Sequence, residues 1–137
     1  MRAKILICFI LLTCLVYLNK AQAQDSDYIE FGSGGGFSGK TISYRLLPDG
    51  SLMKSESRTE PAFQSYKKLS KKTFKKLKVK ICEAGFFNVS IDKPYNLSYF
   101  ITGSYCNKSN KIIWGDPTYT LPENFQELYK ELLRLTE

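Results

Sequence analysis

The glycine-rich stretch Gly34–Thr41 matches G-x-x-x-x-G-K-[ST], the phosphate-binding loop of nucleotide hydrolases. In those enzymes the loop joins a buried strand to a helix, so that backbone N–H groups and the helix N-terminus bind the phosphates. Here Ile42, Tyr44 and Leu46 alternate with other side chains after Lys40, which is the period of a strand. We therefore predict a glycine-rich connection into a strand and no nucleotide site.

The whole chain contains no histidine. Its absence excludes Ser–His and Cys–His nucleophilic sites, acid–base catalysis by imidazole and most zinc sites. We therefore expect no metal site and no cofactor, and we identify no catalytic residue.

Two carboxylates, Asp116 and Glu123, flank a loop and could form the pair of a glycan hydrolase. Trp114 and Tyr119 lie beside them, but we favour helix-capping charges and core aromatics as the explanation.

Two cysteines outside the N-terminal segment, Cys82 and Cys106, form an even pair. In an exported protein such a pair favours a disulfide, which would close a loop of about 25 residues and stabilise the fold by roughly 3–4 kcal/mol. Cys106, however, shares the strand parity of Ser98 and Thr102, which is not the apolar parity, unless Gly103 forms a bulge. Two separate thiols and metal ligation are the alternatives.

The stretch from Lys67 to Lys80 carries eight lysines. On a helical wheel four of them lie opposite the apolar positions: Lys71, Lys72, Lys75 and Lys76. A solvated helix face is the simplest interpretation. The functional interpretation is binding to an anionic component of a cell envelope, such as lipid phosphates, an acidic polymer or an acidic protein. We do not expect nucleic acid as a partner, because the run lacks interleaved aromatics that could stack on bases.

The N-terminus has the layout of a secretory signal peptide. Arg2 and Lys4 precede the apolar run Ile5–Leu18, and Ala21–Ala23 provides a small-x-small cleavage site. The apolar run has about 14 residues, which is short of the roughly 20 that a membrane-spanning helix needs. A retained anchor and a lipoprotein modified at Cys14 are the alternatives.

Cleavage after Ala23 would remove residues 1–23 and leave residues 24–137 as a single globular domain. The formal net charge would fall from +7 to +4, because the removed segment carries three positive charges and no negative ones. We expect a periplasmic or extracellular monomer that is not an integral membrane protein. Three glycosylation sequons occur, at Asn88, Asn96 and Asn107. They carry glycans only if the source glycosylates asparagine, and we attribute their occurrence to chance.

Alternation with a period of two predicts five strands, at Tyr28–Phe31, Lys40–Leu47, Ser51–Arg58, Leu97–Tyr105 and Lys111–Gly115. Pro48, Asp49 and Gly50 suit the turn of a hairpin between the second and third strands. The third strand is mostly polar after Leu52 and Met53, so we expect it at an edge of the sheet or largely solvated.

Two helices follow from local signals. Ser70 is a good N-cap for the first, and Gly85 is suited to end it. Its apolar stripe consists of Phe74, Leu77, Ile81 and Ala84. The second helix begins near Pro122, which suits a first turn, and Asn124 and Glu127 can form a capping box.

The mature chain thus reads as a strand followed twice by a hairpin and a helix. This order predicts an α+β fold, in which an antiparallel sheet of about five strands carries two helices on one face. The FGSGGGFSG opening, the YRLLPDGSL hairpin and the Trp-Gly-Asp-Pro before the last helix resemble those of small exported bacterial proteins of unknown function. The resemblance covers most of the mature chain and implies no activity and no catalytic residues.

These observations favour a non-catalytic domain that binds or supports a partner in the cell envelope. The alternative is a secreted proteinaceous inhibitor of a hydrolase. Such an inhibitor would present a loop, either Gly32–Gly39 or Asp116–Asn124. A small carboxylate-based glycan hydrolase is the third hypothesis.

Overall fold

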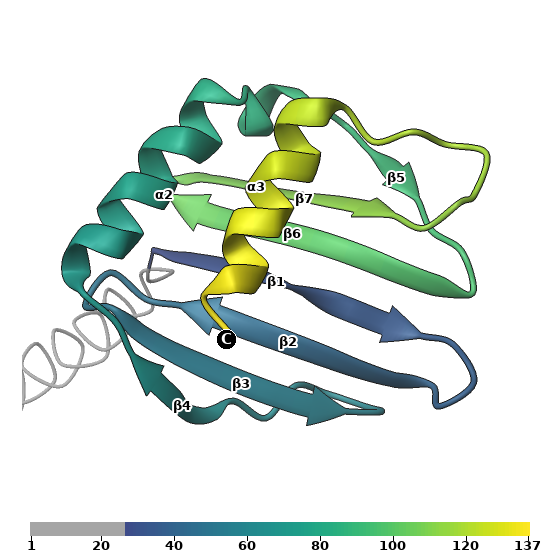
Figure 1. The fold of residues 1–137 in the computed structure, drawn as a ribbon, viewed down its shortest axis with the longest axis horizontal. Coiled ribbons are helices and arrows are strands. Elements are labelled where there is room, and N and C mark those ends of the chain that lie inside the picture. The colour runs from purple at the N-terminus through teal and green to yellow at the C-terminus, as the bar shows by residue number, and fades with distance from the viewer. Residues whose placement is uncertain (1–26) are drawn as a thin grey trace, which may run out of the picture.

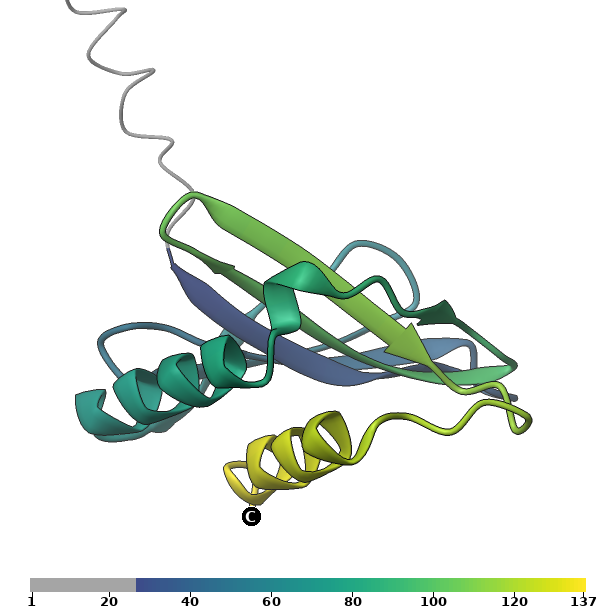
Figure 2. The same cartoon turned by 90° about the horizontal axis from the view of Figure 1, so that it is seen from above.

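The structure is a computed structural model and describes residues 27–137. The predicted signal peptide, residues 1–23, lies outside the described residues. A seven-stranded sheet carries two helices on one of its faces (Figures 1 and 2). The elements along the chain are β1 (Tyr28–Gly35), β2 (Lys40–Leu46), β3 (Ser51–Ser57), β4 (Gln64–Lys68), α2 (Lys71–Glu83), the short 3₁₀ helix η1 (Phe86–Asn88), β5 (Asp92–Lys93), β6 (Leu97–Tyr105), β7 (Lys108–Trp114) and α3 (Glu123–Arg134).

The strands lie in the order β4-β3-β2-β1-β6-β7-β5. All neighbouring strands are antiparallel except β5, which runs parallel to β7. The predicted α+β class with two helices is confirmed, but the sheet has seven strands and not about five. The two missed strands lack apolar alternation, because every residue of β4 is exposed and β5 has only two residues.

The third strand was expected at an edge of the sheet or largely solvated, but β3 lies between β2 and β4 and is only partly exposed. β4 pairs with it on the side away from β2, so β4 is the edge strand. Leu52 is fully buried on the helix side of β3. Ser55 is buried on the opposite side, where its hydroxyl accepts the N–H of Ala62 at 3.0 Å. The connection between β3 and β4 therefore covers part of the open face of the sheet.

The glycine-rich stretch belongs largely to the central strand. β1 continues to Gly35, so only the turn from Gly36 to Gly39 is a loop. Gly32 lies where a Cβ would collide with the carbonyl oxygen of Ile42 and come within 3.0 Å of the Phe100 ring. A strand follows Lys40, as predicted, and the strand-to-helix geometry of a phosphate-binding loop is therefore not present here.

Helix α2 has the ends that the sequence predicts. The Ser70 hydroxyl accepts the N–H of Lys72 at 3.2 Å, and Gly85 follows the helix with a φ of 71°. Helix α3 differs at its start, because Asn124 does not cap it. Its side-chain amide donates to the Ala84 carbonyl oxygen at 3.1 Å, which joins the start of α3 to the end of α2.

The core lies between the two helices and the covered face of the sheet. The helices contribute Phe74, Leu77, Ile81, Phe125, Leu128 and Leu132. The central strands contribute Ile29, Phe31, Leu46, Leu52, Ile101 and Ile112. Neither helix between residues 27 and 137 has the length and apolar character of a membrane span.

Candidate functional site

Three connections from distant parts of the sequence meet at one end of the sheet, on the right of Figure 1. They are the β1–β2 turn at 36–39, the β5–β6 connection at 94–96 and the β7–α3 connection at 115–122. Gly35 pairs with Leu97, and the Gly36 N–H donates to the Asn96 carbonyl oxygen at 2.6 Å. We call this part of the molecule the loop end.

Helices α2 and α3 leave the strand ends near the loop end uncovered (Figure 1). Cross-strand pairing places one side chain from each of five neighbouring strands in a row on the helix side of the sheet. The row consists of Glu56, Ile42, Ser33, Tyr99 and Trp114. Ser33 is small and lies between two larger neighbours, so the row leaves space above the central strand.

Four aromatic side chains form a hollow at the β6–β7 end of this row, which we call the aromatic hollow. Tyr99 and Trp114 stack with ring centroids 6.0 Å apart and 28° between their planes. Tyr129 of α3 lies edge-on to both rings, and Tyr119 and Leu121 of the β7–α3 connection complete the apolar lining. The hollow has a volume of about 420 Å³.

The aromatic hollow is held in place by hydrogen bonds to backbone carbonyls. The Tyr129 hydroxyl donates to the Gly32 carbonyl oxygen at 3.0 Å, which ties α3 to the central strand. The Gln126 amide donates to the Leu121 carbonyl oxygen at 2.6 Å. Burial, with a smaller contribution from Tyr99, raises the pKa of Tyr129, so this phenol stays neutral over the physiological range.

The polar groups of the aromatic hollow are few. Thr120, Gln126 and Lys130 line it in addition to the tyrosine hydroxyls and the indole N–H. Lys130 is the one charged side chain among the lining residues, and no carboxylate lines the hollow. Within residues 27–137, Lys130 makes no ion pair.

The two carboxylates considered for glycan hydrolysis lie outside the aromatic hollow. Asp116 accepts the hydroxyl of Thr118 at 2.7 Å and its N–H at 2.8 Å, and these bonds hold the pKa of Asp116 below its usual range. Glu123 is exposed in the first turn of α3. A glycosidase acid needs a raised pKa, whereas Asp116 has the opposite shift and a structural role in its turn.

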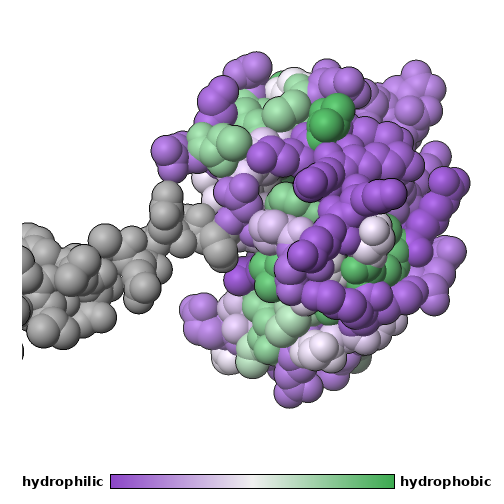
Figure 3. All heavy atoms as spheres, turned by 90° about the vertical axis from the view of Figure 1, so that its left-hand side faces the viewer, coloured by the Kyte–Doolittle hydropathy of each residue, from purple (hydrophilic) through white to green (hydrophobic). Residues whose placement is uncertain are grey.

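The four lysines predicted to face outward are all exposed on α2, at Lys71, Lys72, Lys75 and Lys76. The side of the molecule that α2 occupies is mostly hydrophilic (Figure 3). Lys76 pairs with Glu131 of α3 at 3.1 Å, and Lys80 contacts the same carboxylate. The other three of the four make no ion pair with any residue in the described part of the chain.

Cys82 and Cys106 are free and exposed, so the expected disulfide is not present in this structure. Cys106 lies in the β6–β7 turn with a φ of 52°, and Gly103 pairs in regular register without the bulge that could have corrected its parity. Cys82 Sγ lies 2.9 Å from the Tyr105 hydroxyl, which donates to the Lys78 carbonyl oxygen. The thiol thus contacts a phenol and not the second sulfur.

Sequence reasoning placed Trp114 and Tyr119 beside the loop between Asp116 and Glu123 but did not add Tyr99, Tyr129 and Lys130. The three come from β6 and α3, and only the strand register and the packing of α3 bring them to the same place.

No group of His, Cys, Asp and Glu side chains within residues 27–137 is arranged to hold a metal ion. The chain matches no family model, and no curated protein matches it significantly.

Proposed function

We propose that the chain is an exported, non-catalytic domain that binds a partner protein of the cell envelope through its loop end. The observation that carries this proposal is the exposure of large apolar side chains there. Phe37 is fully exposed at the tip of the β1–β2 turn, and Tyr95 and Leu97 are 63% and 43% exposed beside it. Ile42, 36% exposed, continues this surface onto the helix side of the sheet.

Single exposed apolar residues are normal on a protein surface, whereas their concentration in one place marks an interaction site. Of the seven large hydrophobic residues that are exposed in the described chain, Phe37 and Tyr95 lie in the connections of the loop end, and Ile42 and Leu97 lie in the strands next to them. The backbone that presents them is held by the β1–β6 ladder and by the Gly36–Asn96 hydrogen bond. Folding has therefore already ordered this backbone, so that binding of a partner would cost little additional conformational entropy.

The non-catalytic part of the proposal rests on residue types and their places. The chain has no histidine, and no carboxylate lines the aromatic hollow. Asp116, the acidic residue closest in sequence to Trp114, is committed to a turn. These features favour binding over glycan hydrolysis.

A secreted inhibitor of a hydrolase is the second candidate, and one specific observation favours it. The two loops that sequence reasoning singled out for this role are far apart in the sequence, yet the turn at 36–39 and the connection at 115–122 open at the same end of the sheet, with β6 between them (Figure 1). An inhibitor that blocks an active site needs such a joint surface on a rigid domain.

The test is capture of partners from an envelope extract with three immobilised forms of the protein. The first is the wild type, and the second carries Phe37→Ser, Tyr95→Ser and Leu97→Ser. The third is a matched control with Val79→Ser and Leu133→Ser, which removes exposed apolar groups from α2 and α3, away from the loop end.

A protein that the wild type and the control capture equally, and that the loop-end variant fails to capture, would support the proposal. Equal capture by all three forms would refute it. If the captured protein is a hydrolase whose activity falls in a stoichiometric titration, the chain is its inhibitor. If it is a structural envelope protein, the chain is a binding module. Release of sugar from envelope glycan by the purified chain would instead establish the hydrolase hypothesis.

A further inference from the structure

We propose that the aromatic hollow is a binding site for one residue of an acidic glycan, that is, for a pyranose ring that carries a carboxylate. The site is independent of the partner protein proposed above, because its polar groups and its charge select a ligand of different chemistry. Its volume of about 420 Å³ lies within the range of small-ligand pockets, and its lining is mostly apolar with a few polar groups.

The rings of the aromatic hollow suit one face of a sugar. Tyr99 and Trp114 stack on each other with 28° between their planes and Tyr129 lies edge-on to both, so a sugar would pack on the outer face of one ring of the pair. Aromatic faces carry partial negative charge, which attracts the partly positive C–H groups on the apolar face of a pyranose. Because β6 and β7 hold two of these rings and α3 the third, the surface is formed before a ligand binds.

The polar tips of the lining residues are available for sugar hydroxyls. Tyr129 and Gln126 are already engaged with backbone carbonyls. By contrast, the hydroxyls of Tyr99 and Tyr119 and the indole N–H of Trp114 make no hydrogen bond within residues 27–137. Hydroxyls accept and donate, and the indole N–H donates, so together they match the alternating donors and acceptors of a sugar.

The charge of the aromatic hollow selects an acid. Lys130 is its one charged lining residue, no carboxylate lies in the lining to neutralise it, and it has no ion-pair partner in the described chain. A carboxylate on the bound ring would pair with the ammonium group, whereas a neutral sugar would gain stacking alone.

Trp114 is the sole tryptophan of the chain, so intrinsic fluorescence reports directly on the hollow. The purified protein is titrated with trimers of galacturonate, mannuronate and guluronate and with a hyaluronan tetrasaccharide. The methyl esters of the same oligomers keep the ring and remove the charge, and benzoate supplies a carboxylate on an aromatic ring. We expect a saturable change with at least one acidic oligomer, weaker binding of its ester, and weaker binding as salt rises.

Two variants test the assigned residues. Lys130→Gln should weaken binding of the acidic oligomer roughly two- to fivefold, as expected for an exposed ion pair, and leave binding of the ester unchanged. Tyr119→Ala should weaken binding of both, because it removes a wall of the hollow. Tyr95→Ala is the matched control, because Tyr95 is an exposed tyrosine of the loop end that does not line the hollow.

The absence of a saturable change with all four acidic oligomers would overturn the proposal. Binding of benzoate as tight as that of the best oligomer would also overturn it, because the site would then recognise an aromatic acid and not a sugar. Equal affinity for acid and ester, or no effect of Lys130→Gln on acid binding, would refute the role of the charge. Capture of a partner protein by the loop end affects none of these measurements.

Discussion

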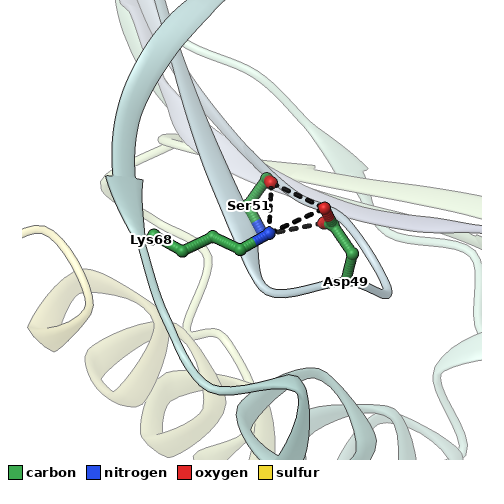
Figure 4. A network of polar contacts seen from close by, with 3 residues as sticks. All are labelled: Asp49, Ser51 and Lys68. Atoms are coloured by element: carbon green, nitrogen blue, oxygen red, sulfur yellow. Dashed lines mark hydrogen bonds and ion pairs between the residues drawn. The ribbon is translucent and has the colours of Figure 1, made fainter.

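Asp49 lies in the turn between β2 and β3, and three donors converge on its carboxylate (Figure 4). The N–H and the hydroxyl of Ser51 each donate at 2.9 Å, and the Lys68 ammonium donates at 2.7 Å. These hydrogen bonds, with Lys68 the largest contributor, hold the pKa of Asp49 well below its usual range. A single side chain thus joins the hairpin turn to the edge strand β4.

The lowered pKa of Asp49 makes stability depend on pH. A carboxylate that ionises more readily when folded stabilises the fold above its unfolded pKa of about 3.9, and this contribution is lost as pH falls towards the folded value. We expect Asp49→Asn to be less stable than the wild type at neutral pH and the difference to shrink below about pH 4. Urea unfolding at several pH values measures it. Glu60→Gln is the control, because Glu60 makes no hydrogen bond or ion pair within residues 27–137. A loss of stability in Asp49→Asn that stays constant across the pH range would contradict the argument.

Gly32 is required by its neighbours and not by its backbone conformation. Gly32→Ala would push a methyl group against the Ile42 carbonyl oxygen of the β1–β2 ladder, where nothing can rotate away. We expect a loss of about 1–3 kcal/mol in the free energy of unfolding, the usual cost of overpacking. Gly34→Ala is the matched control on the same strand, because its new methyl would meet the side chain of Thr41, which can move. Equal losses of unfolding free energy in the two variants would show that steric contact is not the reason why glycine occupies position 32.

The two thiols offer a further test at this scale. Cys82 and Cys106 are exposed and unbonded, so a purified domain of residues 24–137 should present two thiols to a thiol-specific reagent. A reducing agent should leave the melting temperature unchanged. A native protein without reactive thiols, whose melting temperature falls on reduction, would show that the two sulfurs pair in solution.

At the scale of elements, helix α2 was predictable because its signals are local. Ser70, the apolar stripe and Gly85 lie within one stretch of sequence and act through contacts along the helix. The strands β4 and β5 were not predictable in the same way, because their pairing partners and not their own side chains define them. The aromatic hollow could not be predicted from the sequence for the same reason. Tyr99 and Tyr129 come together only through the β6–β7 register and the packing of α3.

The lysines of α2 allow a prediction for a whole helix face. Replacement of Lys71, Lys72, Lys75 and Lys76 by Gln keeps good helix formers and relieves like-charge repulsion of about 0.2–0.5 kcal/mol per pair. Glu131 keeps Lys80 as its partner when Lys76 is removed. We therefore expect an unchanged or slightly higher melting temperature.

The same variant decides whether these lysines form a functional surface. A solvated face predicts that wild type and variant alike fail to bind anionic vesicles. Binding by the wild type that weakens with salt and disappears in the variant would contradict this and would make α2 the site of an anionic partner. Uncharged vesicles are the control for binding that does not depend on charge.

At the scale of the molecule, both edges of the sheet are protected against pairing with another chain. On one edge every residue of β4 is exposed, and the strand ends in Lys67 and Lys68. On the other edge β5 pairs only with Ile113 and Trp114, so most of β7 forms this edge, and Lys108 and Lys111 place charges along it. Charged edges discourage strand addition, so the exposed apolar side chains of the loop end are the remaining route to self-association.

We expect the domain to be a monomer, because a contact between two copies must be self-complementary and both edges of the sheet carry lysines that oppose strand pairing. Sedimentation velocity over a range of concentrations measures the mass. A dimer that Phe37→Ser abolishes would contradict this expectation and would make the loop end a contact between copies of the chain. A dimer that persists in Phe37→Ser but not when Lys67 and Lys68 are replaced would instead show that the edge at β4 pairs despite its charge.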